Sequence, residues 1–147
     1  MQVFIRKGGF WNAKSYKFSS QFGHIMICID DKFYSFTQSD FLEDSKYGCV
    51  QIITKKEFEK TYKGQIWNIV ELTSDEKTKE NVIKYFKETA KNHNYSIVNN
   101  CALECQQALN ESKILNSNKN YVYPGMILSS LKKDAKQKIS KIEKIII

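Results

Sequence analysis

A cysteine at the start of a segment with helical spacing is the first residue whose position suits covalent chemistry. Cys101 ends the segment YSIVNNC (95–101), in which Asn99 or Asn100 is a natural helix N-cap. The unpaired amides and the positive end of the helix dipole stabilise a thiolate there, so we expect a lowered thiol pKa. The same helix start, formed by Asn99, Asn100 and Ala102, is where an oxyanion would be received.

A histidine in an apolar segment is the second such residue. His24 lies in GHIMICID (23–30), and a histidine in a core strand is most often a hydrogen-bonded structural residue. A thiolate at a helix start that faces an imidazole can attack a carbonyl, because the imidazole carries the proton to the leaving group. Cys101 and His24 therefore predict a thiol hydrolase, provided that folding brings them together across 76 intervening residues.

The elements that must position this pair follow from hydrophobic periodicity. Strands are predicted over 2–6, 22–30, 33–37, 50–54 and 65–72, with a turn at Asp30-Asp31-Lys32 that makes the second and third a hairpin. Helices are predicted from about 74 to 92, from Asn100 to Glu111 or Ser112, and from Pro124 onward, with a closing strand over 139–147. The expected fold class is α+β, an antiparallel sheet packed against the helix that carries the cysteine.

The length of 147 residues fits one domain, which we assign to residues 1–147 with a core at about 22–131. The chain has no run of 18 apolar residues, and its first twenty residues lack the apolar region of a secretory signal. We therefore expect no stable membrane insertion. The four cysteines are too few for a disulfide-stapled scaffold of this length, so free thiols are expected.

The net charge of +7 is concentrated at the two ends of the chain. Residues 1–20 carry +4 and residues 113–147 carry +6, whereas residues 21–112 carry −3. Lysine outnumbers arginine 22 to 1, so the bidentate guanidinium contacts that recognise guanine or phosphate are nearly absent. We expect no nucleic-acid partner, although basic ends would help the protein approach anionic polymers.

The main alternative for Cys101 is a buried small hydrophobic residue, as is expected of Cys28 and Cys105. Zinc binding is a second alternative for the cysteines. His24 with Cys28 and Cys101 with Cys105 would supply four ligands of the right types. On a strand, however, residues four apart have Cα atoms separated by about 13 Å, which is too far to share one ion. We therefore expect neither a metal nor another cofactor.

The motifs together resemble the circularly permuted NlpC-like branch of papain-like thiol hydrolases. The resemblance rests on Gly-His opening an apolar strand, YSF (34–36) after the turn, YSIVNNC (95–101), and the proline-led segment YPGMILSSL (123–131). Ordinary papain-like enzymes place cysteine before histidine, whereas the permuted branch places histidine first, as here. The branch includes lecithin:retinol acyltransferase and bacterial cell-wall or effector enzymes.

The resemblance implies roles for individual residues. Cys101 would be the nucleophile and His24 the general base and acid, with a third polar residue that orients the imidazole. The position of that third residue falls at or near Phe36, which cannot form the required hydrogen bond. Ser35 or Gln38 is the expected substitute, with a backbone carbonyl as the alternative; Thr37 and Asp40 are the other polar residues nearby.

Glu104 and His93 are expected to have no catalytic part. Glu104 lies three residues after Cys101 and is expected to be solvated, and His93 is expected to cap the end of the preceding helix or to face solvent.

The resemblance also implies an activity and a setting. We expect cleavage of an amide bond, with peptidoglycan as the substrate, by an effector toxin that a dedicated secretion system delivers to the periplasm of a target cell. A cognate immunity protein is an expected partner, and other amide or ester polymers remain candidate substrates. Two alternatives stay open: a lipid-directed thiol acyltransferase or phospholipase, and a non-catalytic binding module on the same fold.

Overall fold

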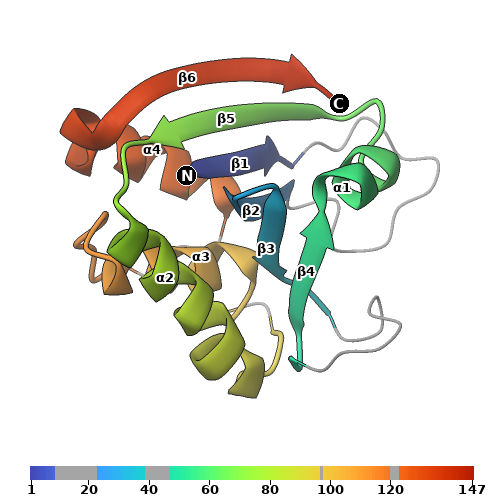
Figure 1. Cartoon of the computed structure of the whole chain (residues 1–147), viewed down its shortest axis with the longest axis horizontal. Coiled ribbons are helices and arrows are strands. Elements are labelled where there is room, and N and C mark those ends of the chain that lie inside the picture. Colours follow the sequence, from blue (N-terminus) through green and yellow to red (C-terminus); the bar gives the residue numbers. More distant parts are fainter. Residues whose placement is uncertain (9–22, 39–46, 97, 120–122) are drawn as a thin grey trace.

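The computed structural model describes residues 1–8, 23–38, 47–96, 98–119 and 123–147. These residues form an α+β fold in which one antiparallel sheet has the strand order β4-β3-β2-β1-β5-β6 (Figure 1). The strands are β1 (Gln2–Lys7), β2 (Gly23–Ile29), β3 (Lys32–Phe36), β4 (Val50–Thr54), β5 (Ile66–Leu72) and β6 (Ile139–Ile146). The α-helices are α1 (Lys55–Thr61), α2 (Glu76–Lys84), α3 (Cys101–Glu111) and α4 (Pro124–Asp134).

The predicted hairpin is confirmed, because β2 and β3 pair antiparallel across a two-residue turn. Asp30 and Asp31 both have positive φ, 48° and 61°. Two left-handed residues match the twist of the flanking strands, and aspartate tolerates this conformation better than most residues. The first strand of the chain is central in the sheet, since β1 pairs with β2 on one side and with β5 on the other.

The sheet separates two hydrophobic clusters. Along β2, Ile25 and Ile27 belong to the larger cluster, which also contains residues of α3 and α4, while Met26 and Cys28 belong to a smaller one that contains Phe58 of α1. This division follows from the alternation of side chains along a strand. The expectation of an antiparallel sheet packed against the cysteine-bearing helix is met, since α3 contacts β2 and β3.

The segment predicted as one helix over 74–92 changes its winding. The helix α2 begins after Asp75, whose carboxylate accepts the Thr78 amide at 2.7 Å, and it ends at Lys84. A π-helical turn over Tyr85–Thr89 and a 3-10 turn over Ala90–Asn92 follow. The wider turn accompanies the burial of two successive aromatic residues, Tyr85 and Phe86.

The helix α1 was not predicted from the sequence. Its start is a complete capping box, in which the Glu57 amide donates to Thr54 Oγ1 at 3.3 Å and the Thr54 amide donates to Glu57 Oε2 at 2.7 Å. Phe58 is its one buried residue, so the helix presents no apolar periodicity. Among the described residues, no helix combines the length and the apolar character required to cross a membrane.

Candidate active site

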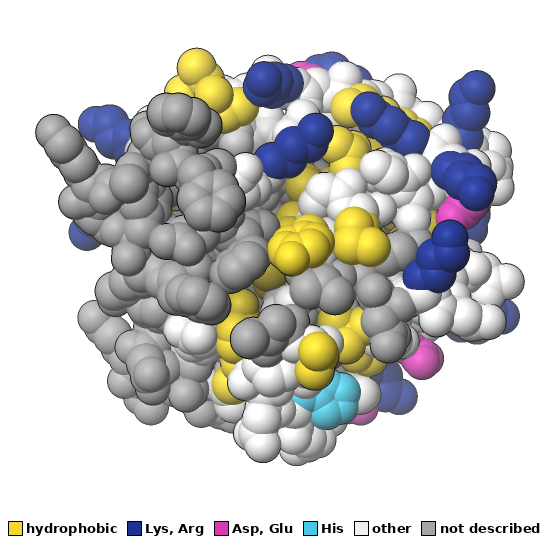
Figure 2. All heavy atoms as spheres, turned by 180° about the vertical axis from the view of Figure 1, so that it is seen from behind, with side chains coloured by type: hydrophobic (Ala, Val, Ile, Leu, Met, Phe, Trp, Pro, Cys, Tyr) yellow, Lys and Arg dark blue, Asp and Glu magenta, His cyan; other side chains and the backbone are white. Residues whose placement is uncertain are grey.

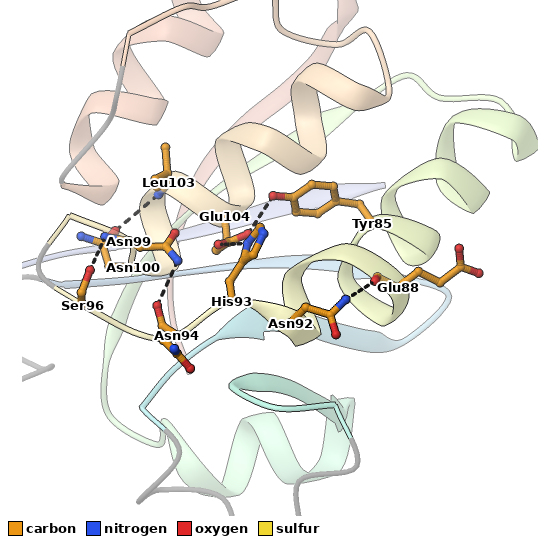
Figure 3. Close-up of polar contacts among 10 residues, drawn as sticks. All are labelled: Tyr85, Glu88, Asn92, His93, Asn94, Ser96, Asn99, Asn100, Leu103 and Glu104. Carbon is orange, nitrogen blue, oxygen red and sulfur yellow. Dashed lines mark hydrogen bonds and ion pairs between the residues drawn. The ribbon is translucent and has the colours of Figure 1, made fainter.

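The start of α3 is built as the sequence predicts. Asn100 has an extended backbone, with φ of −130°, and its Oδ1 accepts the Ala102 amide at 2.9 Å. The same oxygen accepts the Leu103 amide at 3.3 Å (Figure 3). Asn100 is therefore the N-cap, and Cys101 is the first residue of the helix.

The asparagine before the cap holds the preceding turn. The Asn99 side-chain amide donates to the Asn94 carbonyl at 2.9 Å, and its backbone amide donates to Ser96 Oγ at 2.9 Å (Figure 3). Both Asn99 and Ala102 thus have partners that stabilise the helix start. These groups would have to leave their partners to bind an oxyanion, so the oxyanion role remains a prediction.

The first turn of α3 rests on the backbone of β2 beside His24. The pairing of β2 with β3 ends at Ile27, so the backbone groups of Ile25 have no strand partner on that side. The helix supplies partners instead: Cys105 Sγ donates to the Ile25 carbonyl at 3.9 Å, and an Ile25 backbone hydrogen bond acts on the Cys101 sulfur. Folding therefore brings Cys101 to the residue that follows His24 in the chain.

His24 lies among aromatic residues on the α1 side of the sheet. Its ring is stacked on Tyr62, with centroids 6.0 Å apart and planes at 25°, and meets Trp67 edge to face at 6.4 Å. The residue is 8% exposed, and its Nε2 is buried without a hydrogen-bond partner. Arg6 pairs with His24 across β1 and β2 and places its guanidinium carbon 5.9 Å from the Trp67 ring.

Burial controls the protonation of both candidate catalytic groups. It raises the pKa of the Cys101 thiol to about 11, although backbone hydrogen bonds from Ile25 and Ala102 and the charge of Arg6 act in the opposite direction. The expectation of a lowered thiol pKa is therefore wrong, because Cys101 is only 5% exposed and desolvation outweighs the helix start. Burial, assisted by Arg6, lowers the pKa of His24 to about 3.

The resting pair at neutral pH is consequently a thiol and an uncharged imidazole. The described contacts include no hydrogen bond between the two side chains. Cys101 belongs to the larger cluster on the α3 side of the sheet, whereas the His24 ring packs on Tyr62 and Trp67 on the α1 side, so the structure brings the sulfur to the backbone next to His24 and does not show a formed pair. Arg6 lies within electrostatic range of both groups, since its charge affects the pKa of each. This neighbourhood is the candidate active site.

None of the described contacts of the residues expected to orient His24 involves His24 itself. Ser35 is fully buried and its Oγ donates to Gln51 Oε1 at 3.3 Å. Phe36 is buried and stacks on Tyr95 with centroids 5.8 Å apart. Gln38 is half-buried beyond the end of β3, and Asp40 lies outside the described residues. The prediction that Ser35 or Gln38 completes the site remains a prediction.

Glu104 is buried, contrary to the expectation of a solvated side chain. It is 1% exposed, its Oε2 accepts the Tyr85 hydroxyl at 2.7 Å, and its Oε1 lies 2.7 Å from His93 Nδ1 (Figure 3). His93 is a C-cap as expected, because its amide donates to the Ala90 carbonyl at 3.0 Å at the end of the 3-10 turn; its side chain, 40% exposed, also pairs with this carboxylate. A buried carboxylate requires such partners. The three residues tie the first turn of α3 to the segment after α2.

Sequence reasoning missed Arg6 and Tyr62 as members of this neighbourhood. Arg6 lies two positions after Phe4 on β1, so the two side chains lie on the same face of the sheet. The alternating pattern of the strand could have revealed this. Tyr62 follows α1, and its signal was the capping-box spacing of Thr54 and Glu57. In the part of the chain that the structure describes, no group of three or more His, Cys, Asp or Glu residues could hold a metal ion.

The exposed surface bears on the lipid-directed alternative. Six large hydrophobic residues are exposed on the described surface: Ile66, Val98, Tyr123, Met126, Ile142 and Ile146. On the face that Figure 2 shows, hydrophobic side chains form several small groups, and lysines are spread among them and along the rim. Among the described residues on this face, the hydrophobic side chains therefore form no broad apolar surface of the kind that docks on a membrane.

No family model, curated protein or solved structure matches this chain.

Proposed function

We propose that the protein is a thiol hydrolase of the permuted NlpC-like type, with Cys101 as nucleophile and His24 as the proton-transfer group. One observation supports this most directly: the first turn of α3 rests on the backbone of Ile25, the residue next to His24. A cysteine at a helix start beside a histidine-bearing strand supports acyl transfer to sulfur, which also needs the imidazole to reach the sulfur.

The reaction would proceed through an acyl-cysteine. The Cys101 sulfur attacks the carbonyl carbon of an amide while His24 accepts the thiol proton, and the imidazolium then returns that proton to the leaving amine. Water attacks the thioester in the second half of the cycle, with His24 taking its proton and the sulfur leaving. The free acid and the thiol are restored, so atoms and protons balance.

The raised thiol pKa and the lowered imidazole pKa favour concerted proton transfer over a preformed ion pair. At neutral pH the sulfur keeps its proton, with a thiol pKa of about 11. The imidazole, with a pKa of about 3, is uncharged but is too weak a base to remove the proton from the resting thiol. The proton therefore leaves the sulfur as the sulfur attacks. Arg6 stabilises negative charge that develops on the sulfur or the carbonyl oxygen.

The proposed substrate is the peptide or amide bond of peptidoglycan, reached by delivery to the periplasm of a target cell. The basic ends of the chain support this substrate, since 12 of the 23 lysines and arginines lie in residues 1–20 and 113–147. A concentration of positive charge raises the local amount of an anionic polymer. A cognate immunity protein is part of the same proposal.

Expression of the wild type and of Cys101→Ala in the cytoplasm and in the periplasm of a bacterium tests this function. Lysis only in the periplasm, and only with the thiol present, is the expected result. Release of new amino groups from purified peptidoglycan gives the matching measurement in vitro. Killing in the cytoplasm would redirect the search to lipid or protein substrates.

Cys28→Ala is the matched control. Cys28 is also a buried thiol, but it lies in the cluster with Phe58 on the α1 side of the sheet. We expect Cys28→Ala to lyse cells as the wild type does. Equal lysis by Cys101→Ala would refute the proposed nucleophile and leave the binding-module alternative.

A further inference from the structure

The imidazole of His24 lacks the polar partner that usually fixes a catalytic histidine. Its Nε2 is buried without a hydrogen bond, Ser35 donates to Gln51, and Phe36 stacks on Tyr95. A general base must nevertheless be held in one orientation for proton transfer to a fixed sulfur. The orientation of His24 must therefore come from its other contacts.

We propose that Tyr62 is a positioning residue that orients His24 by aromatic stacking, an inference that rests on the proposed function. The two rings are nearly parallel, at 25°, with centroids 6.0 Å apart. Trp67 contacts the imidazole from another side, in an edge-to-face arrangement. Stacking on one ring and edge contact with another restrict rotation about both side-chain torsions of His24, as a hydrogen bond would do.

Tyr62 is itself held firmly enough for this task. It is the C-cap of α1, where its amide donates to the Phe58 carbonyl at 3.0 Å and its carbonyl accepts the Gln65 amide at 3.1 Å. Its ring packs on Phe58 and on Trp67, each with centroids 5.2 Å apart. The capping box at the other end of α1 thus contributes to the placement of the imidazole.

Burial and nearby charges act on the Tyr62 hydroxyl. Burial raises its pKa to about 12, while the charge of Arg6 acts in the opposite direction and that of Cys101 adds to the increase. The ring of Tyr62 also helps to exclude water from the imidazole, whose pKa is lowered by burial. Orientation and exclusion of water come from the ring, and the hydroxyl is not required for either.

Substitutions of Tyr62 separate the ring from the hydroxyl. Tyr62→Phe keeps the ring, and Tyr62→Met keeps most of the volume without a π face. Single-turnover acylation of the full-length protein by 4-nitrophenyl acetate measures thiol activation, because the nitrophenolate leaves without a proton. We expect Tyr62→Phe to stay within about twofold of the wild type and Tyr62→Met to react about tenfold more slowly.

Nuclear magnetic resonance of the two histidines gives a readout that does not depend on catalysis. In the wild type the His24 ring protons should resonate upfield of those of His93, because the His24 ring packs on Tyr62 and Trp67. His93 takes part in none of the described ring contacts. Tyr62→Met should move the His24 signals downfield and raise the midpoint of their titration, because water reaches the imidazole. Tyr62→Phe should leave both unchanged, and His93 serves as the internal reference.

The outcomes separate the positioning role from the proposed function. Unchanged acylation and unchanged His24 signals in Tyr62→Met would overturn the positioning role, as would an equal loss in Tyr62→Phe. Full peptidoglycan hydrolysis by Cys101→Ala would overturn the proposed function while leaving the His24 signals to decide the stack. If Tyr62→Met does not fold, as judged by circular dichroism, Tyr62→Leu provides the same comparison.

Discussion

Replacement of His24 by phenylalanine should make the free energy of unfolding less dependent on pH in mildly acidic solution, by nearly the contribution of one titrating group. His24 is buried uncharged, with its pKa lowered from 6.5 to about 3 by burial and by Arg6. The unfolded chain binds a proton at this histidine below pH 6.5, whereas the folded chain binds none until about pH 3. The stability that depends on the neutral imidazole is therefore present above pH 6.5 and is lost as the pH falls toward 3.

The magnitude follows from the two pKa values. Between pH 7 and pH 5 the unfolded state gains about 2 kcal/mol from protonation of His24, and the folded state gains almost nothing. Phenylalanine preserves the aromatic contact with Tyr62 but does not titrate. The wild type should thus lose about 2 kcal/mol more than His24→Phe over this interval.

Urea unfolding of both proteins at pH 7 and pH 5, followed by circular dichroism, measures this difference. The two proteins share every other titrating group, so the comparison isolates His24. His93→Gln is the control, since it removes the other histidine and should retain the extra loss that His24 causes. Equal losses in the wild type and His24→Phe would show that His24 is solvated or charged in the folded protein.

Three further predictions concern the same region. Alkylation of Cys101 by iodoacetamide, followed by peptide mapping, should accelerate about tenfold per pH unit from 7 to 10, because the thiolate fraction rises toward a pKa of about 11; a plateau below pH 9 would contradict the burial argument. Asn100→Ala should lower the free energy of unfolding by about 1–2 kcal/mol through loss of the cap, and Asn100→Asp should retain most of it; no difference between them in urea would argue against the cap. Tyr85→Phe should cost about 1–3 kcal/mol because the buried Glu104 carboxylate loses a donor, whereas a neutral effect in the same assay would mean that water replaces the hydroxyl.

The strands and the cysteine helix were predictable because their signals are local. A continuous apolar run marks β2, the two aspartates mark its turn, and Asn100 marks the start of α3. The helix α1 has only Phe58 buried, so periodicity could not reveal it, although its capping box could. The π-helical turn after α2 contains Tyr85, whose hydroxyl donates to Glu104 of another helix, and no local pattern predicts that contact.

The protonation states of the candidate site were not predictable from position alone. The start of a helix does lower the pKa of a thiol, and the Cys101 and Ala102 amides act in that direction. The extent of burial, however, depends on how α3 seats against Ile25, and this outweighs the local effect. Glu104 shows the same limitation, because its partners Tyr85 and His93 come from a segment 11 or more residues away.

The central place of β1 in the sheet has a consequence for the order in which the protein can assemble. Phe4 pairs with Met26 on one side and with Ile69 on the other, so the second partner is about 65 residues later in the chain. During synthesis, strands β1 to β4 can pair as soon as they leave the ribosome. The other edge of β1 stays unpaired until β5 has emerged. Such distant pairing slows folding, and it makes the nascent chain a target for chaperones until β5 closes that edge.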